Sequence, residues 1–196
     1  YALVVFIVVP LAAGALLRGA PGTYTRRSSE TTWKSTLIDS SGQMFTPFVS
    51  VRGDVTAMKI DTQPGVANYI PTGESNVVRT MPTVGLEYRY PLISVQSWGT
   101  GTLEPIAQLI FRPNETNIGT IPNEDAQSLI FDDSNLFKIN KFSGWDRVEG
   151  GGRVNYGATW TTQFNQGGFL NVLFGQSYQM FGVNSFAAPD ATNTGL

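Results

Sequence analysis

The sequence predicts an all-β protein: an antiparallel meander of long strands that forms part of a transmembrane β-barrel. Three observations support this fold class: strict alternation of apolar and polar residues, turn residues between the alternating runs, and a low content of charged residues. Successive side chains of a strand point to opposite faces of the sheet, so the alternation places an apolar row on one face and a polar row on the other.

The clearest hairpin is expected from strands at 153–164 and 169–180, joined by the turn 165–168. Both strands exceed the usual mode of about 5 to 6 residues, and their polar rows are mostly uncharged. These traits are typical of a barrel with lipid outside and a hydrated interior. The apolar, lipid-facing row includes Val154, Tyr156, Trp160, Val172, Phe174 and Tyr178. The row expected to line the interior includes Arg153, Asn155, Thr159, Asn171, Ser177 and Gln179.

Further alternating runs predict more strands of the same meander. Strands are expected at 30–38, 44–56, 84–90 and 103–112. Connections rich in Pro, Gly, Asn and Ser are expected at 61–79, 91–101 and 113–145. No helical periodicity of useful length is present. With neither an initiator Met nor a closing strand, the sequence is expected to be a fragment of a longer barrel.

Composition supports the same fold class. Charged residues are 14% of the chain, against about 25% in a soluble domain, and Ser, Thr, Asn and Gln make up 55 of its 196 residues. A net charge of -2 without a basic stripe argues against a nucleic-acid partner. The absence of both Cys and His excludes Ser-His-Asp and Cys-His catalysis, disulfides and the commonest zinc sites.

The N-terminal segment 1–21 is atypical because it lacks the alternating pattern. Residues 2–17 are uncharged and almost wholly apolar, with Pro10 in the middle and Arg18 after the run. A spanning helix needs about 20 apolar residues and disfavours a central proline, and a secretory signal begins with a basic region. Two short strands joined near Pro10, a buried or poorly ordered end, and a membrane helix all stay open.

The long connection and the residues after it carry the densest ionisable chemistry. The acids offer oxygen ligands to a hard cation, but their spacing does not match the twelve-residue calcium loop, and nothing in it favours a glycosidase pair. Solvated or luminal acids are the alternative. The candidate luminal or gate residues are Glu124, Asp125, Asp132, Asp133, Asp146, Arg147, Glu149 and Arg153. We assign no catalytic, cofactor or metal site.

Two expectations concern how this connection is arranged. Its apolar residues, a mixture unlike a disordered linker, predict an ordered loop that folds against the barrel. Asp146 is expected to pair with Arg147 or Arg153, while an ion-pair network and a ligand-binding role both stay open for this group. The expected anchors are Leu129, Phe131, Leu136, Phe137 and Phe142.

Ordered blocks of sequence carry a family resemblance. They are LEPIAQ at 103–108, IPNEDAQSLIFDDSNLF at 121–137, FSGWDRVEGGGRVNYG at 142–157 and GQSYQMFG at 175–182, preceded by Trp33 and GQMFTPF at 42–48. Together these blocks resemble the lipopolysaccharide-assembly outer-membrane family LptD, also called the organic solvent tolerance family. The resemblance covers roughly residues 22–186 and identifies 22–196 as part of the family's C-terminal outer-membrane β-barrel domain.

The resemblance also implies a function, partners and a location. The family's barrel assembles lipopolysaccharide into the outer leaflet of the Gram-negative outer membrane, works with the plug lipoprotein LptE, and receives its substrate from a periplasmic lipopolysaccharide-transport bridge. The implied partners are these three and membrane lipid, with no nucleic acid, no cofactor and no enzymatic reaction. A general porin or adhesin barrel, and a soluble β-sandwich carbohydrate-binding module, remain open as alternatives.

Overall fold

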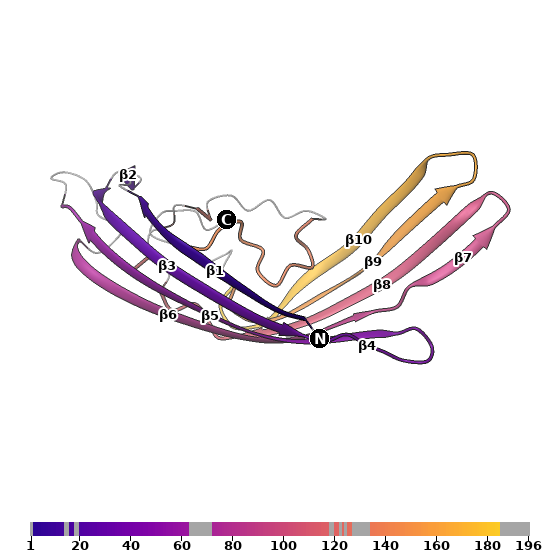
Figure 1. Ribbon diagram of the computed structural model, residues 1–196, viewed down its shortest axis with the longest axis horizontal. Helices are drawn as coiled ribbons and strands as arrows, with labels where there is room; N and C mark the ends of the chain where they lie inside the picture. Colours follow the sequence, from indigo (N-terminus) through magenta and orange to yellow (C-terminus); the bar gives the residue numbers. More distant parts are fainter. Residues whose placement is uncertain are drawn as a thin grey trace.

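Over the residues that it describes, the computed structural model shows one antiparallel sheet of ten strands, bent into an open trough (Figure 1). Its long strands follow the order β1-β3-β5-β6-β8-β9-β10, with the short strands β2, β4 and β7 paired at the ends. The all-β antiparallel meander predicted from the sequence is therefore confirmed. The structure describes residues 2–13, 16–17, 20–62, 72–117, 120–121, 123, 125–126 and 134–184.

The sheet combines long strands of 12 to 17 residues, which exceed the usual strand length, with the short strands β2, β4 and β7. The strands are β1 (Ala2–Ala13), β2 (Leu16–Leu17), β3 (Ala20–Lys34), β4 (Leu37–Ile38), β5 (Met44–Ile60), β6 (Gly73–Arg89), β7 (Leu92–Gln96), β8 (Gly99–Arg112), β9 (Gly151–Phe164) and β10 (Phe169–Phe181). The described ranges contain no helix with the length and apolar character that a helical membrane crossing requires.

Both hairpins predicted from the sequence form. β10 pairs antiparallel with β9, from Phe169 opposite Gln163 onward. In the turn between them, Gly167 and Gly168 have φ of 95° and 90°, a region that glycine enters without steric cost. β5 pairs with β3 and with the short β4 in the second hairpin.

Two predicted connections contain strand instead. β6 begins at Gly73, inside the connection expected at 61–79, and before Val84 it pairs with β5 alone. That unpaired edge tolerates Pro82, which lacks a backbone N–H, so the proline does not end the strand. β7 occupies part of the connection expected at 91–101 and pairs with the start of β8.

The N-terminal segment forms one strand over 2–13 that continues through Pro10, and neither the two short strands joined near Pro10 nor the membrane helix that the sequence left open. β1 pairs with β3, and its register shifts between Val8 and Leu11. Pro10 lies inside this shift. Because proline cannot donate to the ladder, an irregularity of pairing at this point is expected.

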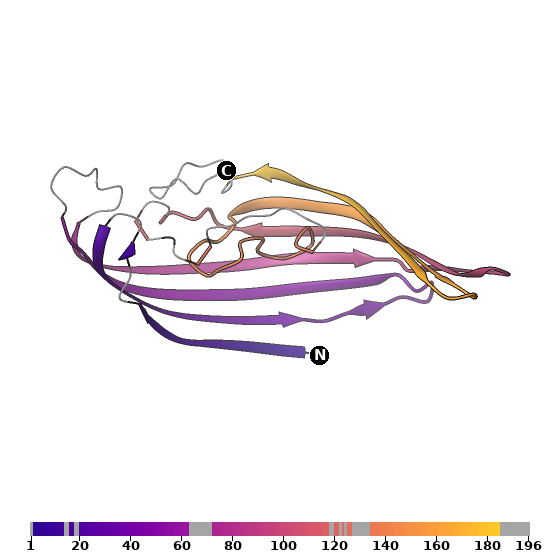
Figure 2. The same ribbon diagram turned by 90° about the horizontal axis from the view of Figure 1, so that it is seen from above.

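Alternation along the strands separates two faces. On β5, Arg52 and Asp54 are buried, whereas Val51 and Val55 are 49% and 52% exposed. The buried side chains lie on the concave side, since Arg52 donates to Trp145, one of the described residues after β8 that cross the trough there (Figures 1 and 2). We call these residues the inner segment, defined as 113–117, 120, 121, 123, 125, 126 and 134–150.

Apolar contacts help to hold the inner segment on the concave face. Ile121 joins a buried cluster with Tyr24 of β3 and with Met58 and Ile60 of β5. Leu136 and Val148 are also buried, at 4% and 1% exposure. Burying a side chain of this size typically contributes about 1.5 to 3 kcal/mol. The inner segment is therefore packed against the sheet.

Close packing within the concave face depends on a small residue. Phe48 of β5 and Gly85 of β6 are register partners, and the Phe48 ring is 4% exposed. A Cβ atom at Gly85 would collide with this ring and with the carbonyl oxygen of Leu109. Gly85 thus provides the space into which Phe48 packs.

Candidate functional site

Besides Arg89 of β6, which pairs with Glu87 and Glu104 within the sheet, five adjacent strands each place one arginine on the concave face. We call this set the arginine band; it consists of Arg26 (β3), Arg52 (β5), Arg79 (β6), Arg112 (β8) and Arg153 (β9). Each of the five donates to, or pairs with, an oxygen of the inner segment. The band arises because all five arginines occupy inward positions of their strands.

Arg26 binds two carboxylates of the inner segment. Its Nη2 lies 2.7 Å from an Asp125 oxygen, and its Nη1 pairs with Asp146. The Tyr24 hydroxyl, one inward position earlier on β3, donates to the same Asp146 oxygen at 2.7 Å. Because the Asp146 side chain is only 1% exposed, its negative charge is balanced by the Arg26 guanidinium and not by solvent.

Arg52 and Arg79 flank the one carboxylate that the sheet contributes to this part of the network. Arg52 Nε and Arg79 Nε donate to Asp54 at 3.0 and 2.8 Å. The Arg52 guanidinium also stacks over the Trp145 ring at 4.5 Å, a cation–π contact. Arg79 pairs with Glu115, and its Nη1 donates to the Asp146 carbonyl oxygen at 2.7 Å.

Arg112 differs from the other members of the band. Its Nε donates to Thr83 Oγ1 at 2.7 Å and its Nη1 donates to the Glu149 carbonyl oxygen at 3.0 Å. Both acceptors are neutral. The side chain is 9% exposed, and none of the ion pairs found among the described residues includes it. Arg112 is therefore a buried cation held by neutral oxygens.

Glu149 balances two cations at the end of the inner segment. It pairs with Arg153 and lies 3.3 Å from Lys141 Nζ. Lys141 Nζ also reaches Asn155 at 3.4 Å and Ser177 at 3.1 Å, which connects the inner segment to β9 and β10. Burial lowers the pKa of Lys141 to about 8, even though the Glu149 charge opposes this shift.

Asp125 links two turns of the inner segment to the sheet. Burial acts to raise its pKa, but hydrogen bonds from Arg26 and from the backbone N–H groups of Trp145 and Asp146 outweigh it, and the pKa falls to about 2. These two N–H groups lie 3.0 and 2.8 Å from its Oδ1. The carboxylate is therefore ionised over the physiological pH range.

The structure brings together the candidate site residues that it describes. Asp125, Asp146, Glu149 and Arg153 all belong to the network between the inner segment and the sheet. Arg147 is buried beside them. Glu124, Asp132 and Asp133, and the expected anchors Leu129 and Phe131, lie outside the described residues.

The partner expected for Asp146 needs correction. The sequence predicted Arg147 or Arg153, but Asp146 contacts Arg26 on β3, and Arg153 pairs with Glu149. Residues far apart in sequence compete for the same carboxylate, and sheet geometry decides between them. Sequence reasoning also missed the roles of Arg26, Arg52, Arg79, Arg112, Glu115 and Lys141. Charged residues at inward positions of long strands were the available signal.

The described carboxylates of this site are held by cations and backbone donors. Within the described ranges, no group of three or more Asp and Glu side chains is placed to hold a metal ion. The carboxylates face guanidinium or ammonium groups, or backbone N–H donors. Such charge-assisted hydrogen bonds hold a segment in place or bind an anion.

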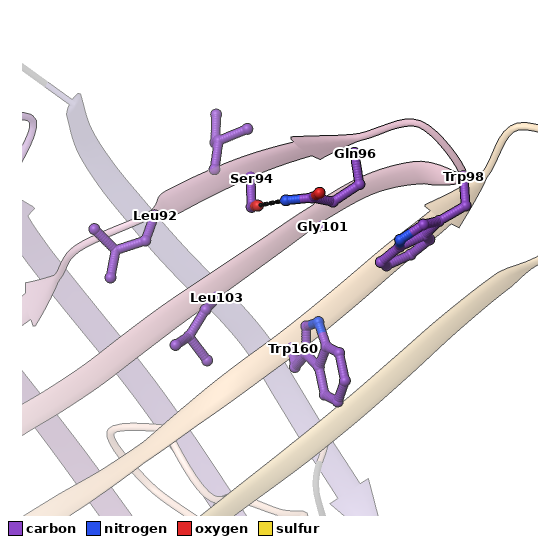
Figure 3. Close-up of a pocket in the computed structure, with 8 residues that line it drawn as sticks. Leu92, Ser94, Gln96, Trp98, Gly101, Leu103 and Trp160 are labelled. Carbon is purple, nitrogen blue, oxygen red and sulfur yellow. Dashed lines mark hydrogen bonds between the residues drawn. The ribbon is translucent and has the colours of Figure 1, made fainter.

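The convex face has the opposite character. Large apolar side chains are exposed on it from β5 to β10, with Val78 at 70% and Phe174 at 73% exposure. Near the turns at one end of the sheet, an open hollow of about 520 Å³ is lined by Leu92, Trp98, Leu103 and Trp160 (Figure 3). Its lining is mainly apolar, and Ser94 and Gln96 beside it bond to each other at 2.9 Å.

Comparison with known proteins identifies the family. The family model described as LptD, LPS transport system D, matches residues 14–196. A Vibrio cholerae protein named LPS-assembly protein LptD is 32% identical over 116 residues, which are 55% of this chain and 14% of the relative. A Nitrosococcus oceani protein of the same name is 31% identical over 122 residues, 60% of this chain and 15% of that relative. The match thus spans about a seventh of each curated relative. Because the family model covers nearly the whole sequence, the chain belongs to the LptD family.

Proposed function

We propose that this chain forms part of the wall of an outer-membrane β-barrel in the translocon that assembles lipopolysaccharide into the outer leaflet. The observation that carries the proposal is the division of the curved sheet into an apolar convex face and a charged concave face. A barrel wall needs lipid-compatible side chains outside and a hydrated, polar interior. Membership of the LptD family supports lipopolysaccharide as the substrate.

The convex face has the dimensions of a membrane belt. On β8, the outward residues from Leu103 to Phe111 cover nine positions, and a tilted membrane-spanning strand needs about 9 to 11. Aromatic pairs lie near both ends of this belt, as expected for residues at the two membrane interfaces. The pairs are Trp98 with Phe164 at 5.9 Å at the turn end and Phe111 with Phe181 at 5.9 Å at the other.

The two ends of the sheet suggest its orientation. Turns of a few residues join the strands at one end, at 39–43, 97–98 and 165–168. Longer connections, at 61–72 and 113–150, leave the other end. Outer-membrane barrels have short periplasmic turns and longer extracellular loops. We therefore assign the end with the long connections to the cell exterior.

We assign residues 22–196 to the barrel domain, with β1 as a further strand at its edge. The inner segment shapes the lumen or acts as a gate, and it carries the candidate luminal residues Asp125, Asp146, Arg147 and Glu149, with Arg153 on β9. Glu124, Asp132 and Asp133 stay candidates for the same role from their sequence alone. The contribution is passive: the wall provides a polar path, and no covalent step is required. In the whole protein, the plug lipoprotein LptE and the periplasmic bridge would be the partners.

A depletion experiment tests this function. Cells whose own copy is repressed would receive the intact protein, either wild type or Asp146→Ala, and newly made lipopolysaccharide at the cell surface would be quantified. We expect the wild type to restore surface delivery and Asp146→Ala to restore less. The matched control is Glu74→Gln, which removes a carboxylate from the exposed Lys59–Glu74 pair and should behave as wild type.

The outcome also separates this function from the alternatives. A general porin would leave lipopolysaccharide delivery unchanged on depletion and would lower the influx of small hydrophilic solutes instead. A soluble carbohydrate-binding module would be recovered without detergent. Normal delivery in depleted cells would refute the proposal.

A further inference from the structure

We propose that the arginine band is a binding site for phosphate-bearing headgroups, which the inner segment occupies with its own oxygens in this structure. The inference rests on the proposed function and names the chemistry that the lumen recognises. Several phosphates on one headgroup would be bound by arginines of neighbouring strands. The inner segment would have to leave the band for this to happen.

Charge balance supports the proposal. The sheet presents the five arginines of the band, and its own ion pair with them is that of Asp54 with Arg52 and Arg79. The other carboxylates paired with the band among the described residues belong to the inner segment: Glu115, Asp125, Asp146 and Glu149. Without the inner segment, the five arginines of the band would therefore keep Asp54 as their ion-pair partner among the described residues of the sheet and would carry excess positive charge, although the whole chain has a net charge of -2.

The energetics favour an exchange of anions. Removing one partner of a buried ion pair leaves an uncompensated charge, which is strongly destabilising. A phosphate group offers several oxygens that accept hydrogen bonds from guanidinium forks in the bidentate geometry that carboxylates also use. A headgroup that takes the places of Glu115, Asp146 and Glu149 would thus keep the arginines paired. The inner segment could then be displaced without exposing bare charges.

Arg112 provides an independent observation. It lies between Arg79 and Arg153 in the order of the strands, and it is buried with neutral partners only. Arg112 Nη1 donates to the Glu149 carbonyl oxygen and Arg153 pairs with the Glu149 carboxylate, so an anion in the place of Glu149 would face both arginines. This arginine is the member of the band that makes no ion pair among the described residues, although the charges of Glu149 and Glu30 act on it from nearby.

Binding measurements on the intact protein in detergent test the proposal. The probes are bisphosphorylated lipid A, the same lipid A without phosphates, and inorganic phosphate. Arg112→Gln should weaken binding of bisphosphorylated lipid A about tenfold, the effect of losing one charge-assisted contact. It should leave the dephosphorylated lipid unaffected. The matched control is Arg27→Gln, which removes the same charge from the exposed position next to Arg26 on β3.

A second variant tests the competition by the inner segment. Glu115→Gln with Glu149→Gln weakens the hold of the inner segment and leaves all five arginines in place, so it should tighten binding of bisphosphorylated lipid A several-fold. Where this variant does not fold, amide hydrogen exchange on the wild type replaces it. Adding bisphosphorylated lipid A should then speed exchange at Asp146 and Val148, whose N–H groups donate to Asp125 and Glu115.

The outcomes are distinguishable. Binding of inorganic phosphate as tight as that of lipid A, with the same sensitivity to Arg112→Gln, would show a site for free phosphate and overturn the headgroup assignment. Equal binding of both lipid A forms, or an effect of Arg27→Gln equal to that of Arg112→Gln, would overturn the site itself. Each of these results leaves lipopolysaccharide delivery in the depletion experiment untouched, so the proposed function would stand or fall separately.

Discussion

The hydroxyl of Tyr24 donates to the carboxylate of Asp146 at 2.7 Å across 122 residues of sequence. Asp146 accepts from Arg26 as well, so β3 binds the inner segment through two side chains at consecutive inward positions. The carboxylate is almost fully buried. This contact therefore joins β3 to the inner segment, and mutations that remove it should have large effects on stability.

Replacing Asp146 with Asn should destabilise the folded barrel. The substitution keeps the size of the side chain but leaves Arg26 with a weaker acceptor in a buried site, where losing one partner of an ion pair costs about 3 to 5 kcal/mol. Urea unfolding in lipid vesicles would measure the change. The control Glu74→Gln breaks an exposed pair and should change stability by less than about 1 kcal/mol. Equal effects would show that Asp146 is effectively solvated.

Replacing Val172 with Arg should destabilise the protein in a bilayer, but by less than the about 2 to 4 kcal/mol of a midplane position, because Val172 is level with Leu103 at the turn end of the belt. Val172 is exposed on the convex face of β10, where the proposed barrel meets lipid. The neighbouring change Asn171→Arg places the same charge on the opposite face and should cost much less. Folding titrations of both variants in lipid vesicles would measure the two changes in the free energy of unfolding. Equal costs would contradict a lipid-facing convex surface.

Replacing Gly85 with Ala should destabilise the sheet by about 1 to 3 kcal/mol, the usual cost of overpacking. The added methyl group would collide with Phe48 and with the Leu109 carbonyl oxygen. Gly53 on β5 is the matched control, because nothing lies within 4 Å of a Cβ atom there. The denaturant midpoint of unfolding should be clearly lower for Gly85→Ala than for Gly53→Ala. A Gly85→Ala protein as stable as Gly53→Ala would show that Phe48 can move aside.

Acid should release the contact between Asp125 and the backbone. The folded-state pKa of Asp125 is about 2, below the ordinary value of 3.8. Its stabilising contribution is therefore complete above about pH 4 and is lost as the pH falls from there through 2. An NMR titration of the Trp145 amide, which donates to Asp125, should show a midpoint near pH 2. Asp125→Asn should abolish this titration, and a midpoint near 4 would mean that the hydrogen bonds do not form.

Labelling of single cysteines should reveal the orientation of the sheet. The chain contains no cysteine, so Thr72→Cys at the end with long connections and Gln166→Cys in the β9–β10 turn each give one site in it. A membrane-impermeant maleimide added to intact cells should label position 72 and not 166, with the sites located by peptide mass. Both should react after the outer membrane is permeabilised. The opposite pattern would place the long connections in the periplasm.

The sequence alone was enough to predict the fold class and the faces of the strands. Alternation has a period of two only in a strand, so the order of residues by itself assigns the polar and apolar rows of 153–164 and 169–180 to opposite faces. Glycines at 167 and 168 marked the turn. The sequence was less informative where proline or polar residues interrupt the pattern, and for this reason the first part of β6 and all of β7 were expected to be connections.

Only the tertiary structure decided which charges meet. The local sequence DRVEGGGR around 146–153 suggested that Asp146 would pair with a neighbour, yet Arg26, some 120 residues away, lies closer to it in the fold. Register across five strands sets the positions of the arginines, and the path of the inner segment sets the positions of the carboxylates. Ion pairs depend on distances between side chains in space, and a one-dimensional pattern does not contain these distances. The sequence therefore determined that the interior would be polar, and the fold determined that it would be an arginine band covered by the chain's own carboxylates.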